Sequence, residues 1–165
     1  MTAASPEALS DRSVVLSLQE ITEELGDTDP ARTPLDADEA QSLVTALMAA
    51  GGERARTFGI AGEDGRRAAR QLLVHLLQDP DTSSRAAEVL SDPPADEQMS
   101  VEAALVGTVL LGALVAWLQT KVDIRIHRRD GHTEFDFRLR KEAAPPGLLR
   151  ELAATVARLL GGTRE

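Results

Sequence analysis

Residues 100–120, SVEAALVGTVLLGALVAWLQT, constrain the fold of this chain more than any other stretch. From Ala103 to Thr120 the chain runs for 18 residues without a charged side chain. A helix of this length spans ~27 Å, close to the ~30 Å hydrocarbon thickness of a bilayer. So apolar a segment must leave water, either for a protein core or for lipid.

The membrane alternative is a single-span inner-membrane protein anchored by residues 101–120. Trp117 lies where interfacial aromatic residues are common. Four basic residues follow and would place the C-terminal side in the cytoplasm: Lys121, Arg125, Arg128 and Arg129. Residues 1–100 would then have to be exported, although MTAASPEALSDRS has neither the basic nor the apolar region of a cleavable signal peptide.

The core alternative makes residues 101–120 the central helix of a cytoplasmic protein. Gly107 and Gly112 would allow neighbouring helices to approach closely. The amphipathic segments on both sides also need a common apolar partner. We therefore expect this segment to be buried by the chain itself.

Composition favours helix packing and excludes several kinds of site. Hydrophobic residues make up 42% of the chain and aromatic residues only 2%. Residues 1–100 carry 19 acidic and 8 basic residues, a net charge of −11. This part of the chain is therefore unsuited to binding the phosphate backbone of a nucleic acid. There is no cysteine, which excludes disulfides, thiolate catalysis and cysteine metal sites.

Residues 1–92 are expected to form an acidic helical region, with a linker at 93–100. Apolar periodicity predicts helices over about 11–25, 36–51, 63–78 and 82–91, although VVLSL within the first could alone be a short strand. Asp36 and Glu39 have the spacing of a capping box, and Gly51 suits the C-terminal end of the second helix.

The sequence KVDIRIHRRDGHTEFDFRLRK predicts a β-hairpin with strands at about 121–129 and 132–141. Asp130–Gly131 is a preferred pair for a two-residue type I′ turn. Placing it at the tip sets one register, in which three apolar pairs share a face and charge-compatible pairs share the other. The apolar pairs are Val122–Leu139, Ile124–Phe137 and Ile126–Phe135. The opposite face pairs Asp123–Arg138, Arg125–Asp136 and His127–Glu134.

A final helix is expected after Pro145–Pro146–Gly147, with Gly161 at its end. The predicted fold class is α+β: mostly helical, with a central apolar helix, one β-hairpin and a C-terminal helix. Residues 101–165 would form a helix–hairpin–helix unit packed with the first region. The central and final helices are the expected cover for the apolar face of the hairpin.

Candidate sites for chemistry are few. His127, His132 and Glu134 share the polar face of the hairpin and are the candidate zinc ligands, but a solvated strand face with a His–Glu cross-strand pair is the favoured interpretation, because ligands on an exposed hairpin lack supporting groups. Residues 59–67, GIAGEDGRR, could hold an anion at a helix start, yet Glu63 and Asp64 would repel phosphate. We expect no metal, no cofactor and no catalytic activity.

Nucleic acid is not an expected ligand either. Basic and acidic residues interleave between Lys121 and Lys141. Phe135 and Phe137 face the core in the derived register, so they offer no platform for stacking bases.

The C-terminal part resembles a known family. VEAALVGTVLLGALVAWLQTKVDIRIHRRDGHTEFDF, followed by LLRELAATVARLL, is similar to the effector-associated constant component modules of bacterial conflict systems. Those modules share a small-residue-rich apolar helix ending near Trp-Leu, two strands around a glycine turn, and a Leu-rich helix. The resemblance covers about residues 99–160, leaves residues 1–98 unexplained and carries no catalytic motif. It implies a non-catalytic adaptor that works beside an effector protein.

The expected function is therefore a protein-interaction or adaptor module in a bacterial defence or signalling system. The candidate partner is an effector protein encoded nearby. The two edges of the hairpin are expected to be open, which would permit strand addition or homo-oligomerisation. The candidate interaction residues are Arg125, Arg128, Arg129, Asp136 and Arg138.

Overall fold

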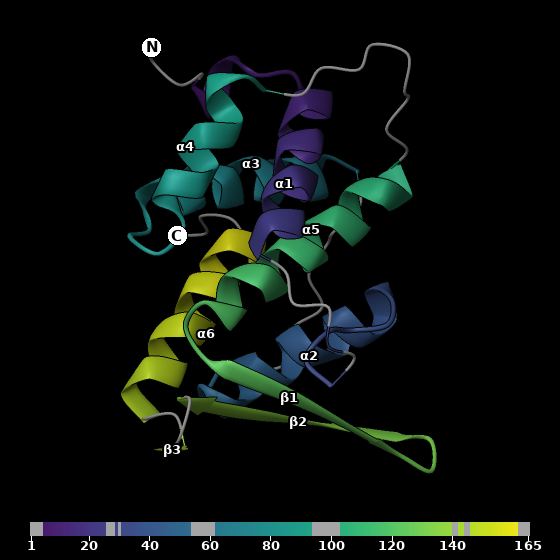
Figure 1. The fold of residues 1–165 in the computed structure, drawn as a ribbon. Coiled ribbons are helices and arrows are strands. Elements are labelled where there is room, and N and C mark those ends of the chain that lie inside the picture. The colour runs from purple at the N-terminus through teal and green to yellow at the C-terminus, as the bar shows by residue number, and fades with distance from the viewer. Residues whose placement is uncertain are drawn as a thin grey trace.

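The computed structural model describes residues 5–25, 29, 31–53, 62–93, 103–139, 142–143 and 146–161. Within these residues the fold is mostly helical with one small antiparallel sheet, so the predicted α+β class is confirmed (Figure 1). The elements in chain order are η1 (Pro6–Ala8), α1 (Asp11–Leu25), α2 (Ala37–Ala50), α3 (Gly62–Gln78), α4 (Ser83–Ser91), α5 (Ala103–Gln119), β1 (Asp123–Arg129), β2 (His132–Leu139), β3 (Glu142–Ala143) and α6 (Pro146–Gly161).

The apolar segment forms α5, which lies at the centre of the molecule. Helices α1, α2 and α3 all pack directly against it (Figure 1). Between Val106 and Leu118, only Thr108 is exposed and only Gly112 is partly exposed. Leu110, Leu111 and Leu114 are completely buried, so the chain's own helices cover this segment.

Across the described ranges, no helix combines the length and the apolarity needed to cross a membrane.

The predicted helical stripes face this core. Val14 and Leu18 lie in α1 and are buried, so VVLSL is helical rather than a strand. The start of α2 is capped as its sequence predicts, because the Asp36 Oδ1 atom accepts a hydrogen bond from the Glu39 backbone N–H at 2.9 Å. Gly51 caps the other end of this helix.

The hairpin has the predicted register. Ile126 lies opposite Phe135 and Ile124 opposite Phe137, within a ladder that runs from Asp123–Arg138 to Arg129–His132. The predicted pair Val122–Leu139 is not part of this ladder, because Val122 precedes β1 and Leu139 pairs with Glu142. Asp130 and Gly131 both have positive φ, 50° and 79°, as a type I′ turn requires. Strand β1 is shorter than predicted, because residues 121–122 form a turn. Residues 140–141 of the second predicted strand lie outside the described part of the chain.

Two features of the sheet were not predicted. A short third strand, β3, pairs with the end of β2, where Leu139 lies opposite Glu142 and Arg138 opposite Ala143. In addition, α2 contacts β2 and packs against both α5 and α6. The sequence predicted that α5 and α6 cover the hairpin, but α2 also contributes to that cover.

Of the predicted linker 93–100, only Pro93 lies within the described residues.

Candidate functional site

The alternation of hydrogen bonds in the hairpin shows which backbone groups point outwards. The Ile126 N–H donates to the carbonyl oxygen of Ala31 at 2.6 Å, so it points away from β2. Ile126 and Phe135 therefore form a non-hydrogen-bonded pair. Because hydrogen-bonded and non-hydrogen-bonded pairs alternate, the N–H and C=O groups of Thr133, Phe135 and Phe137 also point away from β1.

The two edges of the hairpin are consequently unequal, and the expectation of a fully open edge does not hold at Ile126 of β1. The bond to Ala31 attaches the outer edge of β1 to the segment before α2. The outer edge of β2 pairs with β3 only at Arg138 and Leu139. In the described part of the chain, no backbone group pairs with the outward groups of Thr133 or Phe135.

This open edge lies on the part of the hairpin that is most exposed. Every residue from His127 to Glu134 is exposed, and the tip extends beyond the helices (Figure 1). Phe135 and Phe137 are only partly buried, although both pack against the core. The open edge therefore offers unpaired main-chain groups beside incompletely covered aromatic rings.

Arg128 anchors the hairpin to α2. Its Nε lies 2.9 Å from Glu39 Oε2 and 3.1 Å from Glu39 Oε1, and its Nη2 donates to the Thr33 carbonyl at 3.0 Å. These hydrogen bonds from Arg128 hold the pKa of Glu39 below its ordinary value, against the opposing effect of partial burial. Arg128, a predicted interaction residue, is thus bonded to residues of its own chain. The sequence did contain a signal for this contact, because Arg128 lies two residues after Ile126 and so shares the core-facing side of β1 with it.

The other predicted interaction residues share the polar face of the sheet. Arg125 is half-buried, with its Nε 3.3 Å from Asp123 Oδ2, and lies opposite Asp136. Arg129 is exposed at the tip. Arg138 lies in β2 opposite Asp123, and its side chain is outside what the structure describes.

The candidate zinc ligands His127, His132 and Glu134 are all exposed, and His127 lies opposite Glu134. Among the residues that the structure describes, no group of three His, Asp or Glu side chains is placed to hold a metal ion.

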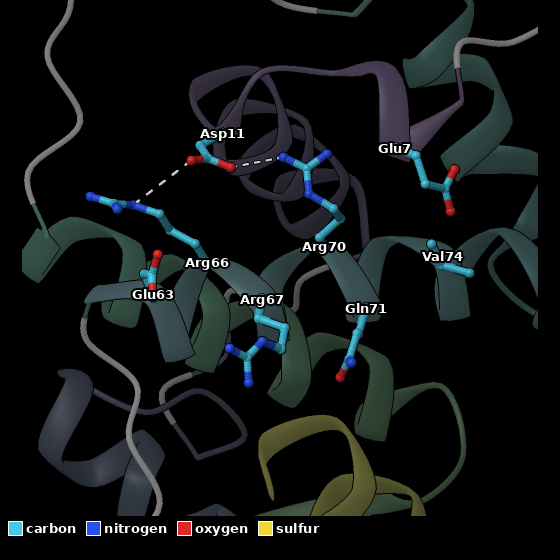
Figure 2. A pocket seen from close by; sticks show the side chains of 8 residues that line it. All are labelled: Glu7, Asp11, Glu63, Arg66, Arg67, Arg70, Gln71 and Val74. Atoms are coloured by element: carbon cyan, nitrogen blue, oxygen red, sulfur yellow. Dashed lines mark hydrogen bonds and ion pairs between the residues drawn. The ribbon is translucent and has the colours of Figure 1, made fainter. Parts of the chain in front are cut away.

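A second candidate is a pocket of about 490 Å³ beside the start of α3 (Figure 2). It brings together three arginines and three carboxylates: Arg66, Arg67, Arg70, Glu7, Asp11 and Glu63. Arg70 donates to Asp11 Oδ1 at 2.8 Å and to the carbonyl oxygens of Pro6 and Leu9, so it fixes η1 and the start of α1.

The charges in this pocket balance, which argues against a phosphate site. Arg66 also approaches Asp11, at 4.0 Å, whereas Arg67 points away from that carboxylate (Figure 2). Glu63 lies at the rim. Of the sequence 59–67, residues 59–61 lie outside the described part of the chain.

A third cluster lies between α3 and the end of α5. The carboxylate of Asp79 is buried and accepts hydrogen bonds from Trp117 Nε1 at 2.9 Å, Lys121 Nζ at 2.8 Å and the Asp81 backbone N–H at 2.9 Å. The edge of the His75 ring meets Trp117, with ring centroids 4.8 Å apart.

Electrostatics in this cluster favour the charged pair. Burial acts to raise the pKa of Asp79, but the hydrogen bonds from Lys121 and Trp117 outweigh it and the pKa is lowered. Burial likewise acts to lower the pKa of Lys121, and its bonds to Asp79 and Asp81 raise it instead. A protonated lysine is not a nucleophile, and this lysine, which follows α5, instead joins that helix to the Asp79 carboxylate after α3. The sequence offered no signal for it, because Asp79 lies 38 residues from Trp117.

No known protein family matches this chain, and no curated protein or solved structure is significantly similar to it.

Proposed function

We propose that this protein is a non-catalytic interaction module that binds an extended segment of a partner protein along the open edge of β2. The observation that carries the proposal is the outward direction of the Thr133 and Phe135 main-chain groups, which pair with nothing in the described residues. An exposed strand edge is a template for a further strand, and the main-chain hydrogen bonds supply affinity.

The hairpin is held in a way that suits this role. Arg128 and Glu39 attach β1 to α2, and the Ile126–Ala31 bond occupies the outward N–H at the middle of β1. That N–H is therefore not available to a partner. A strand that is already positioned loses less conformational entropy on binding, which favours affinity.

The resemblance of residues 99–160 to effector-associated modules supports a partner in a bacterial defence or signalling system. In this proposal the chain acts in the cytoplasm as an adaptor, and the effector contributes the added strand. The basic and acidic residues on the polar face, Arg125, Arg129, Asp136 and Arg138, would flank that strand.

The experiment compares Thr133→Pro with Thr133→Val in the full chain. Proline removes the outward N–H of Thr133 but leaves the bonds between β1 and β2, whereas valine keeps the N–H and the strand preference. Peptides selected on the wild-type chain from a random display library are expected to bind Thr133→Val normally and Thr133→Pro at least about tenfold more weakly.

Amide hydrogen exchange locates the bound peptide. Binding should protect the amides of Thr133 and Phe135, while the Glu134 amide, which points towards β1, is protected before binding and reports that the hairpin of Thr133→Pro is intact. The proposal fails if selection yields no binding peptide, or if Thr133→Pro with an intact hairpin binds as well as Thr133→Val.

A further inference from the structure

The charges on the open strand have an arrangement that reads the same in both directions. The residues of β2 on the face opposite Phe135 and Phe137 are, in order, basic, acidic, acidic and basic: His132, Glu134, Asp136 and Arg138. Residues directly opposite on neighbouring strands interact, and like charges there are destabilising. This arrangement therefore determines which strands can lie beside β2.

A second copy of β2 is a poor occupant. An antiparallel pairing centred on Phe135 places Glu134 opposite Asp136 of the other copy twice, and His132 opposite Arg138 twice. A pairing centred on Glu134 places this carboxylate opposite itself at the middle of the overlap, although His132 then lies opposite Asp136. A pairing centred on Thr133 places His132 opposite Glu134 but overlaps only residues 132–134 of the two strands, because β2 begins at His132. Registers shifted further towards Leu139 are obstructed by β3, which already pairs there.

The existing neighbour of β2 shows what does fit. Strand β1 places His127 opposite Glu134 and Arg125 opposite Asp136. On its other face it presents Ile124 and Ile126 to the core, beside Phe137 and Phe135. A strand of the same pattern on the open edge would meet Glu134 with a basic residue and cover the exposed parts of both phenylalanine rings.

We infer that the occupant of this edge is a strand of a different protein, in which apolar residues alternate with basic residues that lie opposite Glu134 and Asp136. The same two carboxylates keep copies of this chain from pairing with one another. The inference rests on the proposed function and adds the chemistry of the partner. Because the charge pattern is the same in both directions, it does not select a parallel or an antiparallel partner.

The probes are two synthetic peptides of about eight residues, the usual strand length, with blocked ends. One alternates valine with lysine and the other alternates valine with glutamate. Fluorescence polarisation with the full wild-type chain is expected to show about tenfold tighter binding of the lysine peptide. Glu134→Lys should abolish or reverse this preference.

Two variants separate local recognition from the overall charge of −9. Glu151→Lys makes the same charge change at an exposed position on α6 and should keep the preference for the lysine peptide. Thr133→Pro should lose the binding of both peptides. If Glu151→Lys removes the preference as fully as Glu134→Lys does, bulk charge explains it and the inference is overturned.

The outcomes also distinguish the inference from the proposed function. Equal binding of the two peptides to wild type, lost in Thr133→Pro, would overturn the charge inference and leave strand addition standing. Undiminished binding of the lysine peptide to Thr133→Pro would overturn both.

Sedimentation tests self-pairing independently. Wild type is expected to show no association through the β2 edge. Glu134→Lys turns both repulsive carboxylate pairs of the Phe135-centred register into attractive ones, so it should associate more strongly than wild type. A wild-type dimer that Thr133→Pro dissociates would contradict the inference.

Discussion

At the scale of single residues, the cluster around Asp79 joins three parts of the chain. Asp79 directly follows α3, Trp117 lies in the last turn of α5, and Lys121 precedes β1. The buried carboxylate has three donors, so its desolvation is compensated. His75 lies at the edge of the cluster, with its Nε2 atom 3.9 Å from Asp79 Oδ2. This nitrogen is buried and has no hydrogen-bond partner among the described residues.

We predict that the free energy of unfolding falls as pH is lowered from about 7.5 to about 5.5, and that His75 contributes to the fall. Burial lowers the pKa of His75; Asp79 opposes this effect, and the charges of Arg158 and Lys121 add to it. The unfolded chain, with a histidine pKa of about 6.5, therefore binds this proton more readily than the folded protein. The stabilisation is present above that pH and is lost as pH falls towards the folded pKa.

Urea denaturation followed by the fluorescence of Trp117, the single tryptophan, measures this dependence. His75→Gln should flatten the pH profile, whereas His132→Gln, the same change at an exposed position, should keep the wild-type slope. An unchanged slope in His75→Gln would contradict the prediction. Asp79 acts only at lower pH, because its pKa lies below the usual value near 4 and its stabilisation is lost as pH falls through that range.

At the scale of elements, a glycine sets how closely α2 and α6 pack. A Cβ atom at Gly51 would collide with the Cβ of Ala153 and with the carbonyl oxygen of Leu149, both in α6. The first of these atoms is attached directly to the backbone and the second belongs to it, so neither can move without moving the helix. The close approach places α2 between α6 and the hairpin, and α2 carries Glu39, the anchor of Arg128.

We predict that Gly51→Ala destabilises the protein by about 1–3 kcal/mol, the usual cost of overpacking a core. Gly147→Ala is the matched control: a Cβ atom there meets nothing within 4 Å, and alanine favours the first turn of α6. Its stability should equal or exceed that of wild type. Thermal unfolding of both variants measures the difference, and equal stabilities would show that α2 and α6 can separate at little cost.

At the scale of the whole molecule, α5 is the element on which the other helices depend. It is surrounded by α1, α2 and α3, and α3 in turn contacts α4 and α6. Its side chains occupy the middle of a single core that extends from Val14 in α1 to Leu160 in α6. The position of the hairpin follows from this core, because Val122 and Ile124 continue it into β1.

We predict that Leu111→Glu prevents cooperative folding. Leu111 is completely buried, so the substitution would place an unpaired carboxylate among apolar side chains at a cost of at least about 4 kcal/mol. Thr108→Glu puts the same charge on the exposed side of α5 and should fold. Near-ultraviolet circular dichroism of Trp117 and denaturant titration distinguish the two; a native-like transition in Leu111→Glu would mean that α5 is not the core.

Local pattern in the sequence was sufficient to predict much of this structure. The hairpin register follows from Asp130–Gly131 and strict alternation, because the paired residues are near neighbours in the chain and a shift by one would expose every apolar residue. The Asp36 cap and the apolar stripes of α1 and α3 also depend only on residues within a few turns. The same alternation places Glu134 and Asp136 on one face, so the charge pattern at the candidate site was readable in advance.

Tertiary structure alone decided which edge of the hairpin is open. Arg128 reaches Glu39 across 89 residues and Thr33 across 95, and Asp79 meets Trp117 across 38. No periodicity specifies such partners, because they depend on how packed helices are oriented and on where the segment before α2 crosses β1. The segment before α2 contacts the outer edge of β1 at Ile126, and β3 pairs with the outer edge of β2 only at Arg138 and Leu139. The proposed function depends on the outward groups of Thr133 and Phe135, which have no backbone partner in the described residues.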